Sequence, residues 1–218
     1  THTYTIENND STEFQVNTTT DGTQETPSIA SLTDGGFVVT WAGSGVGDDS
    51  GVFAQLYNSS GVKSGSEFLV NTYTSNSQKD ATVTSLTGGG FVVTWHSYEQ
   101  DGNSWGVYGQ LFDSSATASG GEFLINTHTT NHQWNPSVTS LADGGFVVTW
   151  SSYEQDGSGD GIFAQRFDGS GVKSGNEFQV NTTIDTNQYY PSITGLNDGG
   201  FVVTWASWLQ DGGSDGVY

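Results

Sequence analysis

Hydrophobic and polar residues alternate along this chain in short runs, which is the pattern of β-strands that bury one face in a core. In residues 146–150, the sequence Phe-Val-Val-Thr-Trp places Phe146, Val148 and Trp150 on one face of an extended chain. Similar short runs in the same stretch cover residues 136–141, 162–167 and 178–181. No stretch of ten or more residues carries a helical stripe, so the pattern predicts an all-β protein.

The same unit of sequence occurs four times. The block Gly-Gly-Phe-Val-Val-Thr-Trp ends at Trp41, Trp95, Trp150 and Trp205, so its spacings are 54, 55 and 55. The block Glu-Phe-x-(Val/Ile)-Asn-Thr repeats with the same spacings and begins at Glu13, Glu67, Glu122 and Glu177. A third block ends at Gln55, Gln110 and Gln165. The chain 1–218 is therefore interpreted as one repeat domain.

Each unit is predicted to be a four-stranded antiparallel meander. An Asp-Gly turn precedes the Phe-Val-Val-Thr-Trp strand in three of the four units, and such a turn supplies the positive φ of a tight hairpin. The Val-Val pair in that strand indicates burial on both faces, as in blades stacked face to face. The units span approximately 14–67, 68–122, 123–177, and 178–218 together with 1–13.

The two ends of the chain complement each other. The third block of the last unit stops at residues 216–218, and the first residues of the chain supply the part that is missing. We therefore expect a four-bladed β-propeller of four-stranded antiparallel blades, closed by a strand shared between the termini. Residues near Tyr4 to Ile6 would pair within the sheet that contains Trp205. The alternative is half of an eight-bladed ring formed by two chains.

Composition narrows the classes of partner. The chain has 4 Lys and Arg against 24 Asp and Glu, a formal net charge of −20, which argues against nucleic acid as a partner. It has no apolar run long enough to span a bilayer, so no membrane insertion is expected, and it has no Cys. Aromatic residues make up 13%, too many for a disordered acidic tail. An acidic surface nearly free of Lys suits an extracellular, salty or calcium-containing setting, so the expected location is extracellular or at the cell surface.

Three sequence motifs recur in order: Asp-Gly-Gly-Phe-Val-Val-Thr-Trp, then Gln-Asp-Gly-x-x-x-Gly-(Val/Ile)-(Tyr/Phe), then Glu-Phe-x-Val-Asn-Thr. It resembles a tandem repeat of this length found in large secreted or surface-anchored bacterial proteins of the RTX adhesin type, and the resemblance covers essentially the whole chain. It implies an extracellular, non-enzymatic role and brings no catalytic residues. Two departures are the shorter loop at Gly47-Asp48-Asp49 and Gly88, which replaces the turn Asp of the other units.

The loop that follows each Trp strand is the candidate metal site. Carboxylates spaced around glycines can fold a loop about a hard cation such as Ca²⁺. The candidate ligands are Asp101, Asp156, Asp160, Asp211 and Asp215. The alternative is a plain Asp-Gly turn in which the carboxylate binds its own backbone.

The segment before each first strand is the candidate carbohydrate site, because a Gln stays constant while its neighbours change. Flat aromatic faces beside amides and hydroxyls suit sugar rings. The candidate ligand-binding residues are Gln133, Trp134, Gln188, Tyr189 and Tyr190. The alternative is that these aromatic side chains fill the gaps between blades.

The residues that recur at the same position in each unit are interpreted as structural. The four Trp belong to blade cores, and Gln55, Gln110 and Gln165 are expected to bind the backbone of a neighbouring blade. The four repeated Glu are a poor match for a single active site. The sequence therefore predicts a non-enzymatic extracellular structural or adhesive module, self-assembling by strand complementation. The alternative is a multivalent, lectin-like propeller. The expected partner is accordingly another copy of the chain or a carbohydrate.

Overall fold

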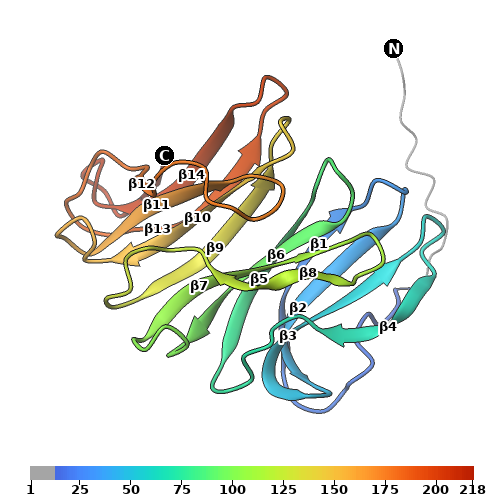
Figure 1. The fold of residues 1–218 in the computed structure, drawn as a ribbon. Helices are drawn as coiled ribbons and strands as arrows, with labels where there is room; N and C mark the ends of the chain where they lie inside the picture. Colours follow the sequence, from blue (N-terminus) through green and yellow to red (C-terminus); the bar gives the residue numbers. More distant parts are fainter. Residues whose placement is uncertain (1–12) are drawn as a thin grey trace.

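The computed structural model describes residues 13–218, which form fifteen β-strands in four antiparallel sheets (Figure 1). We call the sheets blades 1 to 4. Blade 1 contains β1 (Gln24–Ser31), β2 (Phe37–Gly45), β3 (Asp48–Tyr57) and β4 (Lys63–Leu69). Blade 2 contains β5 (Gln78–Ser85), β6 (Phe91–Tyr98), β7 (Trp105–Phe112) and β8 (Ala118–Leu124).

Blade 3 contains β9 (Gln133–Ser140), β10 (Phe146–Tyr153), β11 (Asp160–Phe167) and β12 (Phe178–Gln179). Blade 4 contains β13 (Gln188–Gly195), β14 (Phe201–Trp208) and β15 (Asp215–Val217). The prediction of an all-β fold is confirmed, since the described residues contain no helix and hence none long and apolar enough to cross a membrane.

Each blade is a meander whose strands are hydrogen-bonded in sequence order. The turn between the first two strands of blade 1 shows why the sequence folds in this way. Gly35 has φ +85°, which a side chain would disfavour, and the Asp34 carboxylate accepts the Gly36 N–H at 2.9 Å. Blades 1 to 3 have the predicted four strands.

The second strand of a blade packs against neighbouring blades, and in blade 2 it buries both of its faces in this way. On β6, Phe91, Val93 and Trp95 form what we call the Trp face, which packs against Val38 of blade 1. The opposite face, the Val face, carries Val92 and packs against the Trp face of blade 3. The Val face of each of blades 1 to 3 thus stacks on the Trp face of the next blade, and the hydrophobic core is a series of such layers.

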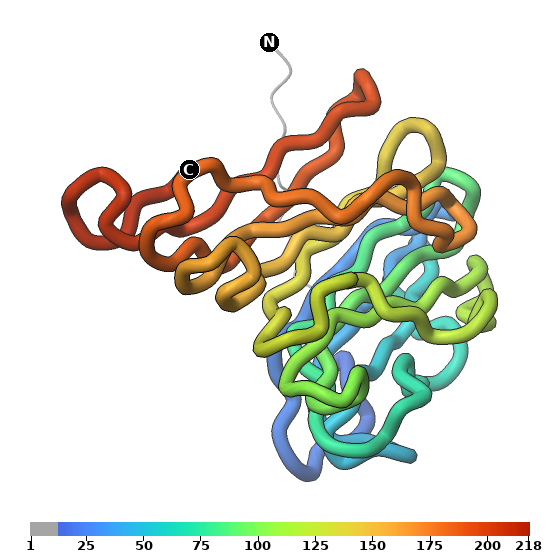
Figure 2. The backbone as a smooth tube through the Cα atoms, turned by 60° about the vertical axis from the view of Figure 1, so that its left-hand side comes forward, coloured from blue at the N-terminus to red at the C-terminus, as the bar shows by residue number. Residues whose placement is uncertain are grey.

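The predicted closure of four blades into a ring is wrong for the residues that the structure describes. The sheets form an open arc with blade 1 and blade 4 at opposite ends (Figures 1 and 2). Blade 4 has three strands, in the order β13-β14-β15, and no fourth strand among residues 13–218 completes it. The expected closing residues, Tyr4 to Ile6, lie outside the described part of the chain. Residues 13–18 lie along blade 1, where Thr18 N–H donates to Glu67 at 2.6 Å.

Candidate functional site

The inner strands of all four blades contain the same backbone irregularity. In β5, two residues, Asp80 and Ala81, lie opposite Trp95 of β6 in a β-bulge. Asp80 has φ +50°, a left-handed conformation that non-glycine residues seldom adopt. The equivalent residues of the other inner strands share it, with φ values of 50°, 52° and 55°, at Thr26, Asn135 and Tyr190. Bulges re-aim side chains, and strained backbone gathers at functional sites.

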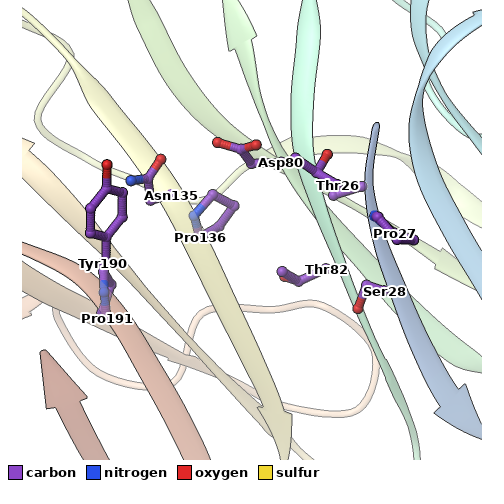
Figure 3. A pocket seen from close by; sticks show the side chains of 10 residues that line it. Thr26, Pro27, Ser28, Asp80, Thr82, Asn135, Pro136, Tyr190 and Pro191 are labelled. Carbon is purple, nitrogen blue, oxygen red and sulfur yellow. The ribbon is translucent and has the colours of Figure 1, made fainter. Parts of the chain in front are cut away.

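These four positions carry different side chains on one repeated scaffold, and all four line one pocket. Figure 3 shows them in a row from Thr26 of β1, past Asp80 and Asn135, to Tyr190 of β13. The cavity has a volume of about 390 Å³, and Pro27, Pro136 and Pro191 form part of its wall. Proline fits the bulge because the N–H it lacks is not needed for the ladder there.

A second cavity of about 820 Å³ adjoins the first and shares Asp80, Asn135 and Tyr190 with it. We call the two together the hub pocket. Two further sets of equivalent positions reach it. The residue before each bulge contributes Lys79, Trp134 and Tyr189. The first residue of the third strand contributes Trp105, Asp160 and Asp215. Indole and phenol rings thus share one depression with the carboxyl groups of three aspartates.

Asp80 and His96 lie together in the wall of the hub pocket. Burial raises the pKa of Asp80, Glu25 raises it further, and Lys79 opposes them. Burial lowers the pKa of His96 to about 3, with Lys79 as a second cause, so its ring is neutral at pH 7. The 3.8 Å contact between His96 Nδ1 and the Asp80 carboxylate is therefore no ion pair. Nδ1 also accepts the Asn135 N–H at 3.3 Å.

The other two carboxyl groups differ in environment. Asp160 is buried, which raises the pKa of its carboxyl group. The nearby Trp134 indole N–H opposes this shift, although the two groups do not reach normal hydrogen-bond geometry. Asp215 accepts a hydrogen bond from the Tyr189 hydroxyl, and this bond raises the pKa of that phenol. The pocket therefore contains the buried carboxyl group of Asp160 and the carboxyl group of Asp215, which is hydrogen-bonded to the Tyr189 phenol.

The sequence-predicted ligand-binding residues divide into two groups. Trp134, Tyr189 and Tyr190 line the hub pocket. Gln133 and Gln188 are fully buried, and their side chains bind the scaffold. Gln133 Nε2 donates to the Thr130 carbonyl at 2.8 Å, and its Oε1 accepts from Asn126 at 3.3 Å. These amides are buried and already hydrogen-bonded to other protein groups. The two Gln side chains therefore stabilise the blades and do not contact a ligand.

The predicted metal ligands are not brought together. No group of three or more His, Asp or Glu that could hold a metal occurs within residues 13–218. Asp101, Asp156 and Asp211 accept backbone N–H groups two residues on, at 3.1, 3.2 and 3.0 Å, as in ordinary Asx turns. Asp160 and Asp215 line the hub pocket instead. Calcium binding by these loops stays a prediction, which a thermal melt with and without chelator tests.

The residues assigned to structure lie inside the blades. Trp41, Trp95 and Trp150 are buried, and Trp205 is half-buried in blade 4. Gln55 donates to the Leu56 and Gly65 carbonyls of its own blade, at 2.9 and 3.2 Å, and the same bonds recur at Gln110 and Gln165. The expectation that these Gln bind a neighbouring blade is wrong, because the amide reaches only the adjacent hairpin.

The candidate residues named from sequence did not include Thr26, Asp80, Asn135 or His96. The first three lie in the segments singled out because their residues change beside a constant Gln, but only the aromatic and Gln residues there were taken as candidates. Thr, Asp, Asn and Tyr occupy one place in four near-identical units, so the scaffold does not dictate the residue there. His96 likewise stands where the other units have Ala42, Ser151 and Ala206. Residues of different units meet only once the blades stack, so their convergence on one pocket could not be read from spacing.

Comparison with protein-family models and with curated proteins gave no match. Solved structures are similar in fold. An endo-arabinase from Bacteroides thetaiotaomicron matches with a TM-score of 0.56 at 14% identity, over 92% of this chain and 76% of the other. A thermostable family-43 glycoside hydrolase matches with a TM-score of 0.52 at 13% identity, over 89% and 70%. A Dyadobacter fermentans protein of unknown function matches with a TM-score of 0.60 at 10% identity, over 85% and 62%.

These neighbours contradict two predictions made from sequence, that the chain is a structural or adhesive module and that it is not an enzyme. The similar solved structures include glycoside hydrolases. The resemblance to a tandem repeat implied a non-enzymatic role, but a fold does not by itself fix a function. What this chain shares with those enzymes is a propeller-like arrangement of antiparallel sheets.

Proposed function

We propose that the protein is carbohydrate-active: it binds an oligosaccharide in the hub pocket and hydrolyses a glycosidic bond there. The observation that carries the proposal is the convergence of aromatic rings and carboxyl groups from three blades on one open depression, at the positions where the repeats diverge. The hub is also where propeller folds place ligands, at the mouth of the central channel.

The aromatic side chains support carbohydrate binding. Trp134 and Tyr190 line the pocket, and the Tyr190 ring is 68% exposed and so is accessible to a sugar ring. Asn135 and Lys79 add polar groups that can bind sugar hydroxyls. The lining is therefore amphipathic in the way a pyranose or furanose ring requires, with apolar faces for C–H groups and donors for oxygens.

Two carboxyl groups in one site can cleave a glycosidic bond. Asp80, whose pKa is raised, keeps its proton to higher pH and donates it to the glycosidic oxygen as the bond from that oxygen to the anomeric carbon breaks. Asp215, held by the Tyr189 hydroxyl, accepts a proton from the water that adds to the anomeric carbon. The products are a new reducing end and a free sugar hydroxyl.

The decisive variant is Asp80→Asn. Asparagine is compatible with this bulge, because Asn135 occupies the equivalent position with φ +52°. We expect the variant to bind arabinan or xylan oligosaccharides as the wild type does, while release of reducing ends falls at least about 100-fold, the usual effect of losing a general acid. Asp198→Asn, in the β13–β14 turn at the far end of the strands, is the matched control and should hydrolyse normally.

Oligosaccharide binding and hydrolysis, the two parts of the proposal, can be rejected separately. Oligosaccharide binding without hydrolysis by the wild type would remove the catalytic assignment and leave the binding site. No binding by calorimetry to either class of oligosaccharide, or binding that survives Trp134→Ala with Tyr190→Ala, would reject the hub pocket as a carbohydrate site.

A further inference from the structure

We infer that His96 is a ligand-binding residue of the hub pocket, where its Nε2–H donates a hydrogen bond to an oxygen of a neutral sugar. The inference rests on the proposed function, because it concerns the ligand of the same pocket. It goes beyond that function by giving a role to a buried imidazole that takes no part in the proposed hydrolysis.

The imidazole at this position is specific to blade 2. His96 lies on β6, and its equivalents in the other blades are Ala42, Ser151 and Ala206. These small side chains show that the packing of the blades does not require a ring here. In blade 2 the ring lines the larger cavity of the hub pocket, as does Lys79, its partner across the ladder. A side chain that the scaffold does not need and that borders a cavity is a candidate for ligand binding.

One nitrogen of the ring is committed to the protein. The bulge in β9 leaves Asn135 without a partner in the β9–β10 ladder, and the Asn135 N–H donates instead to His96 Nδ1 of the neighbouring blade at 3.3 Å. A ring nitrogen that accepts a hydrogen bond carries no proton. Burial lowers the pKa of His96 to about 3, so the ring is neutral at pH 7 and its one proton lies on Nε2.

The other nitrogen is available to a ligand. Within residues 13–218, His96 Nε2 donates to no protein atom, and it is not sealed from solvent as the indole nitrogens of Trp95 and Trp150 are. The Trp105 ring packs against the imidazole, with centroids 4.6 Å apart and 80° between the ring planes. This contact and the backbone hydrogen bond restrain the imidazole, so little side-chain entropy is lost when Nε2–H meets a ligand oxygen.

The charges around His96 favour an uncharged ligand. Among the lining residues that the structure describes, Asp80, Asp160 and Asp215 supply carboxyl groups and Lys79 supplies the only ammonium group. Lys79 Nζ also lies 3.8 Å from Glu25 Oε1. The carboxylate of a uronic acid would therefore meet an excess of negative charge that a neutral imidazole does not offset. The hydroxyl and ring oxygens of a neutral sugar accept an N–H without this cost.

His96→Asn separates the roles of the two ring nitrogens. The side-chain oxygen of asparagine replaces Nδ1 and still accepts the Asn135 N–H, whereas nothing replaces Nε2. We expect the variant to keep the near-ultraviolet circular dichroism of the wild type. By calorimetry at pH 7 it should bind arabinan or xylan oligosaccharides about 3- to 10-fold more weakly, the effect of losing one uncharged hydrogen bond.

Two further variants frame this result. His96→Gln extends an amide nitrogen to the place of Nε2, so it should recover most of the lost affinity. His128→Asn, in the connection between β8 and β9, is the matched control and should bind as the wild type does.

Proton–nitrogen correlation spectra of the wild-type imidazoles give a readout that a purely structural His96 would not move. The free protein should show the Nε2–H tautomer for His96 at pH 7, and a bound neutral oligosaccharide should shift the Nε2 resonance far more than the Nδ1 resonance. Oligogalacturonides of the same length should bind more weakly than the neutral oligosaccharides, because each of their rings carries a carboxylate.

Failure of this inference is distinct from failure of the proposed function. A wild type that binds neither arabinan nor xylan oligosaccharides has no carbohydrate site in the hub pocket, and both proposals are then rejected. A wild type that binds them rejects only the role of His96 in any of three cases: His96→Asn binds equally well, the ligand leaves the Nε2 resonance unchanged, or oligogalacturonides bind more tightly than neutral oligosaccharides.

Discussion

At the scale of single residues, the hub pocket shows how one scaffold supports different chemistry. The bulge on each inner strand holds its residue at a left-handed φ and directs it to the hub, whichever side chain the unit carries. The strain, about 1–3 kcal/mol for each such residue, is offset by the regular blades on either side. The chemistry of the site therefore depends on a few positions, and the blades do not depend on them.

His96 makes the stability of the protein depend on pH. The folded pKa is lowered to about 3, so below the unfolded value of 6.5 the unfolded chain binds a proton that the folded chain does not. Stability present above pH 6.5 is therefore lost as the pH falls, with a slope approaching about 1.4 kcal/mol per pH unit. The raised pKa values of Asp80 and Asp160 act in the opposite direction nearer their own range.

We expect His96→Ser to remove most of this slope between pH 7 and pH 5.5. Serine is the residue that blade 3 has at the equivalent position, Ser151, so the blade can accept it. Urea denaturation at several pH values measures the slope. His128→Ser, in the connection between blades 2 and 3, is the control and should retain it. A wild type whose stability does not fall over this interval would contradict the assignment of a buried neutral ring.

At the scale of elements, a buried Asn ties each outer strand to its blade. Asn126 Oδ1 accepts the Val107 N–H at 2.7 Å, and its amide donates to the His128 carbonyl at 2.8 Å and to Gln133 Oε1 at 3.3 Å. Asn71 and Asn181 make the same set of bonds. One side chain thus joins the third strand, the connection to the next blade and the next inner strand.

Asn126→Ala is expected to destabilise the protein by about 2–4 kcal/mol, because it leaves the buried Val107 N–H and Gln133 amide oxygen without their partner. The midpoint of chemical denaturation should fall while the m-value stays constant. Asn103→Ala, at an exposed position in the β6–β7 loop, should change stability by less than about 0.5 kcal/mol. A cost below about 1 kcal/mol for Asn126→Ala would mean that water replaces the amide.

At the scale of the whole molecule, net charge opposes association. The chain carries a formal charge of −20, so two copies repel each other over distances comparable with the Debye length. This repulsion weakens as added salt shortens the Debye length.

The sequence by itself determined the four units, their strands and the identity of the buried positions. Alternation with a period of two is a local property: Phe91, Val93 and Trp95 face one way because successive side chains of a strand point to opposite sides. Repetition of the same blocks at a near-constant spacing then implies the same blade four times. The loop aspartates could also be read locally, because an Asx turn involves a carboxylate and the backbone two residues on.

Only the tertiary structure decided the openness of the arc and the membership of the hub pocket. The angle between blades results from the summed packing of many side chains, such as Val38 against Phe91, and no local pattern encodes it. Equal repeats are compatible with a closed ring and with an arc alike. Asp80, Asn135 and Tyr190 belong to three different units and meet because bulges turn them to the hub once the blades have stacked. The packing of the blades against one another, and not a local sequence pattern, therefore forms the site.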